Sequence, residues 1–225
     1  MAETNQAATL LVNEIFYSIQ GESTHAGRPC VFVRLTGCNL RCDWCDTEYS
    51  FSEGRRMTVA EVVEQVEAHR CPLVEITGGE PLLQDAVHPL MLALLGRGLS
   101  VMIETSGASD VSRIDPRVIK IMDLKCPGSG ECGKNLWSNL GHLSAHDEVK
   151  FVIGDRADYE WAREMVRSRA LAERVDVNLN AILFSCAFGR LEPARLAAWI
   201  LEDRIPARLQ LQIHKHIWPP GARGV

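Results

Sequence analysis

The sequence lacks an apolar run long enough to cross a membrane. None of its 225 residues belongs to an uninterrupted hydrophobic stretch of about eighteen or more. Residues 1–6 lack the basic start and the apolar run of a secretory signal. These absences predict a soluble, cytoplasmic protein with no membrane partner.

Positive charge is also scarce. Lysine and arginine together number 24, against 29 aspartate and glutamate residues, for a net charge of −5. Proteins that bind nucleic acid usually carry a clustered positive excess, because contacts with phosphates release counterions. The charge balance argues against a nucleic-acid partner and favours a small-molecule substrate.

Internal repeats, low-complexity tracts and linkers that would divide the chain are absent too. A chain of 225 residues that is 46% hydrophobic can bury a proper core. We therefore expect a single domain over residues 1–225.

The hydrophobic pattern predicts alternating strands and helices. Runs rich in β-branched residues predict six strands, at residues 31–35, 73–76, 99–104, 118–124, 148–153 and 175–183. Helical patterns lie between most of them, at residues 58–69, 86–95, 159–171 and 193–201. The first begins with a capping box, in which Glu61 follows Thr58 by three residues.

Strand, helix, strand repetition implies parallel pairing with right-handed crossovers, and hence an α/β sheet or a partial barrel. In such folds the active site lies at the carboxyl ends of the strands. The most irregular stretch, residues 125–146, is rich in glycine and serine and indicates a functional loop.

Three of the eight cysteines lie within eight residues, directly after the first predicted strand. Without an export signal a disulfide framework is not expected, so metal or catalytic roles gain weight. Thiolates at Cys38, Cys42 and Cys45 suit zinc, copper(I) or an iron–sulfur centre, and three ligands leave one position open. The alternative is a redox dithiol of Cys42 and Cys45, or half of a zinc site completed by Cys126 and Cys132 or by Cys71.

The loop resembles the CxxxCxΦC signature of the radical S-adenosylmethionine (SAM) superfamily, with Trp44 in the aromatic position. A second segment supports the resemblance: Thr77-Gly78-Gly79-Glu80-Pro81 directly follows the second predicted strand and is similar to the GGEP motif of that superfamily. The resemblance implies a 4Fe-4S cluster on Cys38, Cys42 and Cys45, with SAM chelating its open iron.

Further segments resemble the 7-carboxy-7-deazaguanine synthase family. They are Tyr17-Ser18-Ile19-Gln20-Gly21-Glu22, Arg34, Cys45-Asp46-Thr47 and His214-Lys215. The family converts 6-carboxy-5,6,7,8-tetrahydropterin to 7-carboxy-7-deazaguanine with loss of ammonia, on the route to queuosine. The resemblance implies a lyase on a shortened TIM-like (β/α)6 barrel with parallel strands. It also implies a homodimer that uses the cluster, SAM, Mg²⁺ and an electron donor of the flavodoxin or ferredoxin kind.

The resemblance also implies roles for single residues. Contacts with SAM are expected from Trp44, Gly78, Gly79, Glu80, Glu104, Ser106, Asp123, Leu124, Lys125 and Ser185. The glycine amides and carbonyls with Glu80 would hold the ammonium group of SAM, and Glu104 and Ser106 its ribose hydroxyls. A turn cap explains Ser106 equally well. The sequence Asp123-Leu124-Lys125 departs from the Ser-Pro-Lys form of some family members.

Contacts with the substrate are expected from Ile19, Gln20, Gly21, Glu22, Arg34, Thr77 and Val225, the last through a tail folded over the site. Arg34 would pair with the substrate carboxylate, or form a structural ion pair with an acidic neighbour. Thr47 would bind Mg²⁺ through its hydroxyl, or simply close the loop. The spacing of His214 and His216 permits a metal site, but packing of a terminal arm is the more common use.

Two other functions compete. One is another radical SAM enzyme, such as an activase that installs a glycyl radical on a partner protein. The other is a non-enzymatic zinc-stapled or iron–sulfur module, which would have four ligands in a closed site and no need of the GGEP segment.

Overall fold

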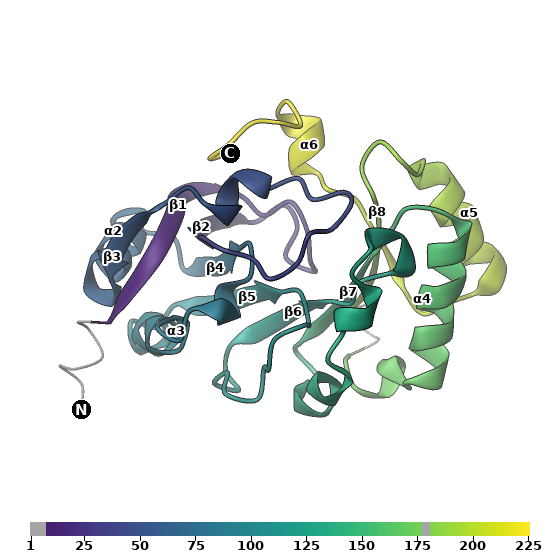
Figure 1. Cartoon of the computed structure of the whole chain (residues 1–225), viewed down its shortest axis with the longest axis horizontal. Coiled ribbons are helices and arrows are strands. Elements are labelled where there is room, and N and C mark those ends of the chain that lie inside the picture. Colours follow the sequence, from purple (N-terminus) through teal and green to yellow (C-terminus); the bar gives the residue numbers. More distant parts are fainter. Residues whose placement is uncertain (1–7, 177–180) are drawn as a thin grey trace.

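Parallel strands in sequential order form the centre of the protein. The computed structural model describes residues 8–176 and 181–225, and its nine-stranded sheet has the order β3-β1-β2-β4-β5-β6-β7-β8-β9 (Figure 1). From β2 to β9 each neighbouring pair is parallel, whereas β1 pairs antiparallel with both β2 and β3. The strands are β1 (Thr9–Ile19), β2 (Pro29–Leu35), β3 (Arg55–Thr58), β4 (Leu73–Gly78), β5 (Ser100–Thr105), β6 (Ile119–Asp123), β7 (Glu148–Ile153), β8 (Ile182–Cys186) and β9 (Arg208–Gln210).

Helices connect most of the parallel strands. They are α2 (Val59–Ala68), α3 (Val87–Gly96), α4 (Arg156–Ser168), α5 (Pro193–Asp203) and α6 (His214–Ile217). Short 3₁₀ helices are η1 (Glu48–Phe51), η2 (Pro81–Leu83), η3 (Pro127–Ser129), η4 (Cys132–Lys134), η5 (Trp137–His142) and η6 (Leu171–Glu173). Figure 1 shows α3, α4 and α5 along the outer side of the sheet, with α6 and the C-terminus near the loop after β2. None of the helices in the described part of the chain is both long and apolar enough to span a bilayer.

The predicted α/β class with parallel strands is confirmed, as are five of the six predicted strands. The sixth, at residues 175–183, is displaced. The observed strand is Ile182–Cys186, Val175 and Asp176 follow the 3₁₀ helix η6, and residues 177–180 lie outside the described part. The predicted irregular stretch at residues 125–146 contains only 3₁₀ turns.

Strands β1, β3 and β9 were not predicted. In β1 the polar pair Asn13 and Glu14 interrupts the apolar alternation, and the pairing register with β2 shifts between Val12 and Glu14. A bulge of this kind removes the two-residue period on which strand prediction depends. β3 and β9, of four and three residues, are too short to show a period.

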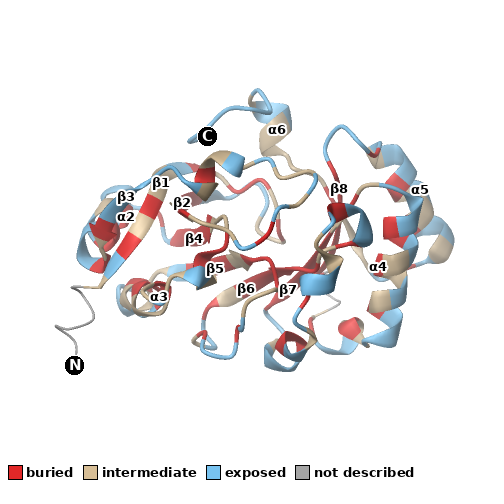
Figure 2. Cartoon of the chain, viewed as in Figure 1, coloured by how far each residue is buried: buried red, intermediate tan, exposed pale blue. Residues whose placement is uncertain are grey.

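The capping box at the start of α2 is present as predicted. The Thr58 hydroxyl accepts from the Glu61 backbone N–H at 3.2 Å, and the Glu61 carboxylate accepts from the Thr58 N–H at 2.7 Å. The apolar residues at helical spacing, Val59, Val62, Val63 and Val66, are all buried. Figure 2 shows the same division throughout, with buried residues on the strands and exposed residues on the outer faces of the helices.

The inner face of the sheet is polar near the carboxyl ends of the parallel strands. Successive strand residues point to opposite faces, so Val74 and Ile76 of β4 enter the core beneath the helices. Glu75 and Thr77 alternate with them and line a cavity instead. The carboxyl ends of the parallel strands therefore carry polar groups into one space.

Removing the Thr58 cap tests whether the capping box stabilises α2. We expect Thr58→Ala to lower the free energy of unfolding by about 1 kcal/mol, because one helix N–H loses its acceptor. Thr58→Ser keeps the hydroxyl and should stay close to the wild type. Urea unfolding of both variants measures the difference, and an unchanged midpoint for Thr58→Ala would contradict the role of the cap.

Candidate active site

A cavity of about 580 Å³ opens at the carboxyl ends of β2 and β4 to β7. Its size is that of a small-molecule site. Most of the predicted site residues line it: Ile19, Gln20, Glu22, Arg34, Cys38, Cys42, Trp44, Cys45, Thr47, Thr77, Gly78, Gly79, Glu104, Ser106, Asp123, Lys125 and Val225. Segments more than 200 residues apart in the sequence therefore meet at one site.

Four predicted site residues do not line the cavity. Leu124 is fully buried, with its backbone N–H bonded to the Lys150 carbonyl at 2.8 Å, and Ser185 is buried within β8. Gly21 serves packing, because a Cβ added there would lie 2.0 Å from Nδ1 of His214. Its carbonyl accepts from Ile213 N–H at 3.0 Å, so the glycine lets the C-terminal segment approach.

Glu80 is the fourth, and it has a structural role. Its fully buried carboxylate accepts from the Thr105 hydroxyl at 3.0 Å, from the Ser106 N–H at 2.8 Å and from the Leu82 N–H at 3.0 Å. The Ser106 hydroxyl donates to it as well, at 2.5 Å. Glu80 therefore ties the end of β4 to the end of β5 and has no acceptor directed at a ligand.

The cysteine loop rests directly on the end of β4. A Cβ at Gly79 would lie 2.2 Å from the Gly37 carbonyl oxygen, so only glycine permits this approach. The Glu80 N–H donates to the same carbonyl at 2.8 Å. The two sequence motifs are therefore one structural unit, in which a side-chain-free strand end supports the loop of thiols.

Three thiols of that loop face the cavity. Cys38, Cys42 and Cys45 are free and partly exposed, and burial raises the pKa of Cys38 and, to about 11, that of Cys42. Across the described residues no three His, Cys, Asp or Glu side chains converge as ligands of one metal ion. A 4Fe-4S cluster has wider spacing, because each thiolate binds a different iron. The free, cavity-facing thiols fit such a cluster.

The alternative zinc site is not assembled. Cys71 is buried, and its thiol donates to the carbonyls of Pro29 at 3.4 Å and Leu73 at 3.5 Å, at the opposite end of the strands. Cys126 is buried in the apolar core around β6 and β7. Cys71 and Cys126 therefore have other neighbours, and Cys132 joins no group of three metal-ligating side chains among the described residues.

The far side of the cysteine loop is held by the second half of the chain. The Asp43 N–H donates to the Ser129 carbonyl at 3.1 Å, and the Arg41 N–H to Glu131 at 2.6 Å. Arg190 donates to the Asp43 carbonyl at 2.9 Å, and its guanidinium lies 5.2 Å from the Trp44 ring centroid. The irregular stretch predicted as a functional loop thus supports the thiols.

One hydrogen-bond acceptor of the protein remains open on the cavity wall beside the thiols. Lys125 Nζ pairs with Asp123 Oδ2 at 2.8 Å, and despite burial the Asp123 charge raises the pKa of Lys125. The other oxygen, Asp123 Oδ1, is buried without a hydrogen-bond partner within the described residues. An orphaned acceptor on a cavity wall suits a hydroxyl or ammonium donor of a ligand such as SAM.

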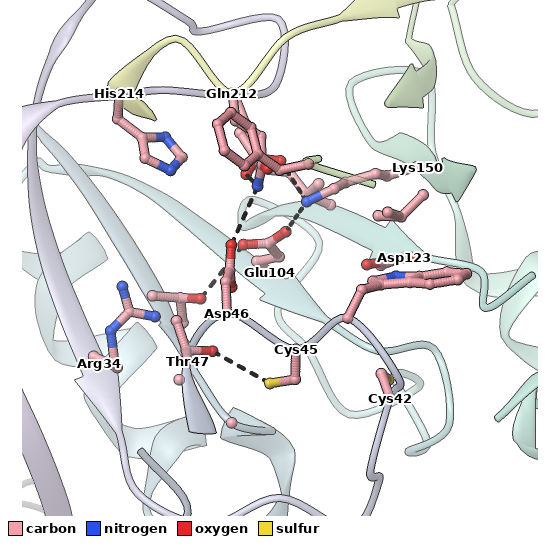
Figure 3. A pocket seen from close by; sticks show the side chains of 18 of the residues that line it. Arg34, Cys42, Cys45, Asp46, Thr47, Glu104, Asp123, Lys150, Gln212 and His214 are labelled. Carbon is pink, nitrogen blue, oxygen red and sulfur yellow. Dashed lines mark hydrogen bonds and ion pairs between the residues drawn. The ribbon is translucent and has the colours of Figure 1, made fainter. Parts of the chain in front are cut away.

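A buried ammonium group occupies the centre of the site (Figure 3). Lys150 Nζ pairs with Glu22 at 2.5 Å and with Glu104 at 2.6 Å. Burial works against its charge, but the two carboxylates raise the pKa of Lys150 well above its ordinary value. Burial likewise opposes ionisation of Glu22. The nearby Lys150 charge has the larger effect, so the pKa of Glu22 is lowered.

Arg34 forms an ion pair with an acidic neighbour, Glu14, which is the predicted alternative to a contact with the substrate. Its Nε donates to Glu14 at 2.8 Å, and the Tyr49 hydroxyl donates to the same oxygen at 2.9 Å. The guanidinium nevertheless lines the cavity, near Thr47 in Figure 3. The pair with Glu14 holds one edge and leaves the terminal amino groups for a ligand.

The C-terminal segment covers the cavity. Gln212 donates to Glu22 at 2.8 Å, and Lys215 pairs with Asp46 at 2.5 Å. Burial opposes ionisation of Asp46, but Lys215 lowers the pKa of Asp46. Pro220, Gly221 and Val225 complete the lining, as predicted for the tail.

The two histidines do not form a metal pair. His214 packs on Gly21, where burial lowers the pKa of His214, and His216 lies edge-on to Phe188. Each histidine thus contacts a different group, as expected for a packed arm.

Several cavity residues were missed from the sequence. They are Glu75, Asp46, Lys150, Phe188, Arg190, Gln212, His214 and Lys215. A signal existed for two of them, because Glu75 and Lys150, like Arg34, are charged residues flanked on both sides by apolar residues of a predicted strand. Asp46, Phe188, Arg190 and Gln212 lie on loops, and His214 and Lys215 lie on the four-residue helix α6, so no period marks them as inward-facing.

Comparison with known proteins identifies the family of this chain. The sequence model of the radical SAM superfamily matches residues 32–182. A 7-carboxy-7-deazaguanine synthase of Koribacter versatilis is 48% identical over 229 residues, covering 95% of this chain and 99% of the relative. The one from Chlorobaculum tepidum is 46% identical, covering 97% and 98%.

A solved structure has the same fold. QueE from Escherichia coli superposes with a TM-score of 0.74 at 23% sequence identity, covering 93% of this chain and 97% of that one. At this identity the likeness concerns the fold alone.

Glu80 provides a test of the site's framework. Glu80→Gln replaces one acceptor oxygen by an amide donor that faces a backbone N–H, so we expect a loss of roughly 1–3 kcal/mol in unfolding free energy. The matched control is Glu64→Gln, on the exposed face of α2. Chemical unfolding measures both, and equal stabilities would contradict the structural role.

Proposed function

The chain belongs to the radical SAM superfamily and, within it, to the 7-carboxy-7-deazaguanine synthase family, and from this premise we propose its reaction. The protein converts 6-carboxy-5,6,7,8-tetrahydropterin to 7-carboxy-7-deazaguanine with release of ammonia. The observation that carries the proposal is that the three thiols and a set of groups suited to a carboxylated heterocycle line the same cavity. The identities of 48% and 46% over nearly the whole chain favour this reaction over a glycyl-radical activase.

Cys38, Cys42 and Cys45 hold the 4Fe-4S cluster in this proposal, with SAM alongside. The bound cluster supplies one-electron reductive cleavage of SAM. Residues around it hold SAM: Trp44, Gly78, Gly79, Glu104, Ser106, Asp123 and Lys125. The unpaired Asp123 Oδ1 and the exposed backbone of the two glycines support this assignment.

The substrate lies beyond SAM, against Ile19, Gln20, Glu22, Arg34, Thr77 and Val225. Arg34 uses its free amino groups to hold the substrate carboxylate, while Glu14 fixes its other edge. The C-terminal segment excludes water, which protects a radical reaction from solvent. Lys150 keeps its proton, so it acts as a fixed positive charge rather than as a base.

Mg²⁺ is part of the proposal through Thr47, whose hydroxyl lines the cavity beside the Arg34 guanidinium. Mg²⁺ takes few protein ligands and completes its shell with substrate oxygens and water, so a single hydroxyl suits it when the substrate carboxylate is adjacent. Asp46 Oδ2 is engaged by Lys215 and is not counted as a ligand.

The sheet completes the picture. Its sequential parallel strands β2 and β4 to β8 form a shortened, open (β/α)6 TIM-like barrel in this proposal, with β1 and β3 at one edge. The chain acts as one radical SAM domain over residues 1–225 and as a homodimer in the cytoplasm. A flavodoxin-like or ferredoxin-like protein supplies the electrons.

The decisive experiment is anaerobic reconstitution with iron and sulfide, followed by addition of SAM, dithionite, Mg²⁺ and carboxytetrahydropterin. Formation of 7-carboxy-7-deazaguanine with one ammonia per turnover is the expected result. Reductive cleavage of SAM without that product would assign the chain to a different radical SAM reaction.

A cysteine variant tests the cluster. We expect Cys42→Ala to retain the fold but to lose at least about 100-fold in SAM cleavage, because loss of a direct ligand exceeds the usual effect of an outer-sphere partner. The iron content and the 5′-deoxyadenosine yield measure it. Cys132→Ala, outside the cavity lining, is the control and should behave as the wild type.

A further inference from the structure

One buried carboxyl of the cavity has no part in the chemistry above. Glu75 lies in β4, is 4% exposed and lines the cavity. Its neighbours Val74 and Ile76 are fully buried in the apolar core, so side-chain alternation turns Glu75 inward with Thr77. A carboxyl in the middle of a buried parallel strand requires partners.

Gln20 holds that carboxyl in place. Its amide Nε2 donates to Glu75 Oε2, and its Oε1 accepts from the Glu22 backbone N–H at 3.0 Å. Both ends of the amide are engaged within the protein, which fixes its orientation. Since a carboxylate can accept about four hydrogen bonds, most of the acceptor capacity here remains on Glu75.

Among the described residues no cation forms an ion pair with Glu75. The ammonium of Lys150 already pairs with Glu22 at 2.5 Å and Glu104 at 2.6 Å. Burial, together with the Glu104 charge, therefore raises the pKa of Glu75 well above its ordinary value. Around Glu75 three carboxyl groups, those of Glu22, Glu75 and Glu104, face the one ammonium group of Lys150.

A ligand edge with two adjacent N–H groups would use the remaining acceptor capacity of Glu75. Two parallel N–H donors match the two oxygens of a carboxylate, and such charge-assisted pairs are stronger than neutral ones. In an aminopyrimidinone ring the exocyclic amino group lies next to a ring N–H and forms an edge of this kind. The reduced pterin of the proposed reaction and its deazaguanine product both carry it.

We propose that Glu75 is a specificity-determining residue. Its carboxyl accepts hydrogen bonds from the amino group and the neighbouring ring N–H of the substrate, while Gln20 holds the carboxyl in position. The inference rests on the proposed function and deepens it. Because substrate and product present the same edge, the contact acts on binding, and its loss raises KM more than it lowers kcat.

The test compares two ligands that differ by one amino group. Calorimetry measures binding of 7-carboxy-7-deazaguanine, and of 7-carboxy-7-deazahypoxanthine, to the anaerobically reconstituted, SAM-loaded protein. We expect Glu75→Gln to weaken binding of the amino ligand roughly 10- to 100-fold, because its amide N–H would face a ligand donor. Binding of the ligand without the amino group should change much less.

A matched control separates recognition from structure. Glu148 on β7 is also a buried carboxyl whose pKa burial raises, and it accepts from the Thr24 N–H at 3.1 Å. It is not among the cavity-lining residues. Glu148→Gln should leave the affinities for both ligands as in the wild type.

Proton release gives a second readout. The groups facing Glu75 are Glu22, Glu104, Lys150 and the Cys30 thiol; Lys150, with its raised pKa, stays charged, and Cys30, with its pKa also raised, stays neutral. Binding of the amino ligand should therefore ionise Glu75, release a proton and tighten as the pH rises. Titrations in buffers of different ionisation enthalpy measure this release, which should vanish in Glu75→Gln.

The outcomes are distinct. Equal weakening of both ligands by Glu75→Gln, or no weakening of the amino ligand, overturns the inference while leaving the proposed reaction intact. Selective weakening supports the inference. Selective weakening in a protein that fails to turn over carboxytetrahydropterin supports the inference and overturns the proposed reaction.

Discussion

One buried ammonium group balances two carboxylates at the centre of the cavity. Lys150 lies between Glu22, in the segment that joins β1 to β2, and Glu104, in β5. A single cation therefore links the β1–β2 connection to the centre of the sheet. Burying ions is costly unless each is paired and hydrogen-bonded, and this arrangement pairs all three. Within the described part of the chain, no cation is left to pair with the carboxyl of Glu75, whose pKa burial and the Glu104 charge raise.

The thiols depend on a second constraint, which is close backbone contact. Gly79 brings the end of β4 against the Gly37 carbonyl, and Glu80 ties the same strand end to β5. On the other side, Ser129 and Glu131 hold the loop through backbone hydrogen bonds. The loop is thus held on both of its sides, between the two halves of the sheet.

Sequence alone located the thiols, the strand ends and most of the lining, because short motifs and the two-residue period are local properties. It failed where the direction of a side chain depends on distant groups. Glu80 belongs to a motif associated with SAM, yet the hydroxyls of Thr105 and Ser106 capture its carboxylate. The sequence assigned no role to Lys150, because its pairing with Glu22 and Glu104 depends on segments far from it in the chain.

The C-terminal segment contacts both the ion pairs around Lys150 and the cysteine loop. Gln212 reaches Glu22, Lys215 reaches Asp46 in the cysteine loop, and Arg223 pairs with Glu53 at 2.8 Å beyond η1. Each contact joins the cover to a different part of the wall, so the cover is complete only when the hairpin end and the cysteine loop are both in place. A wall built from several segments thereby becomes one enclosure, and the electrostatic interactions inside it strengthen as water is excluded.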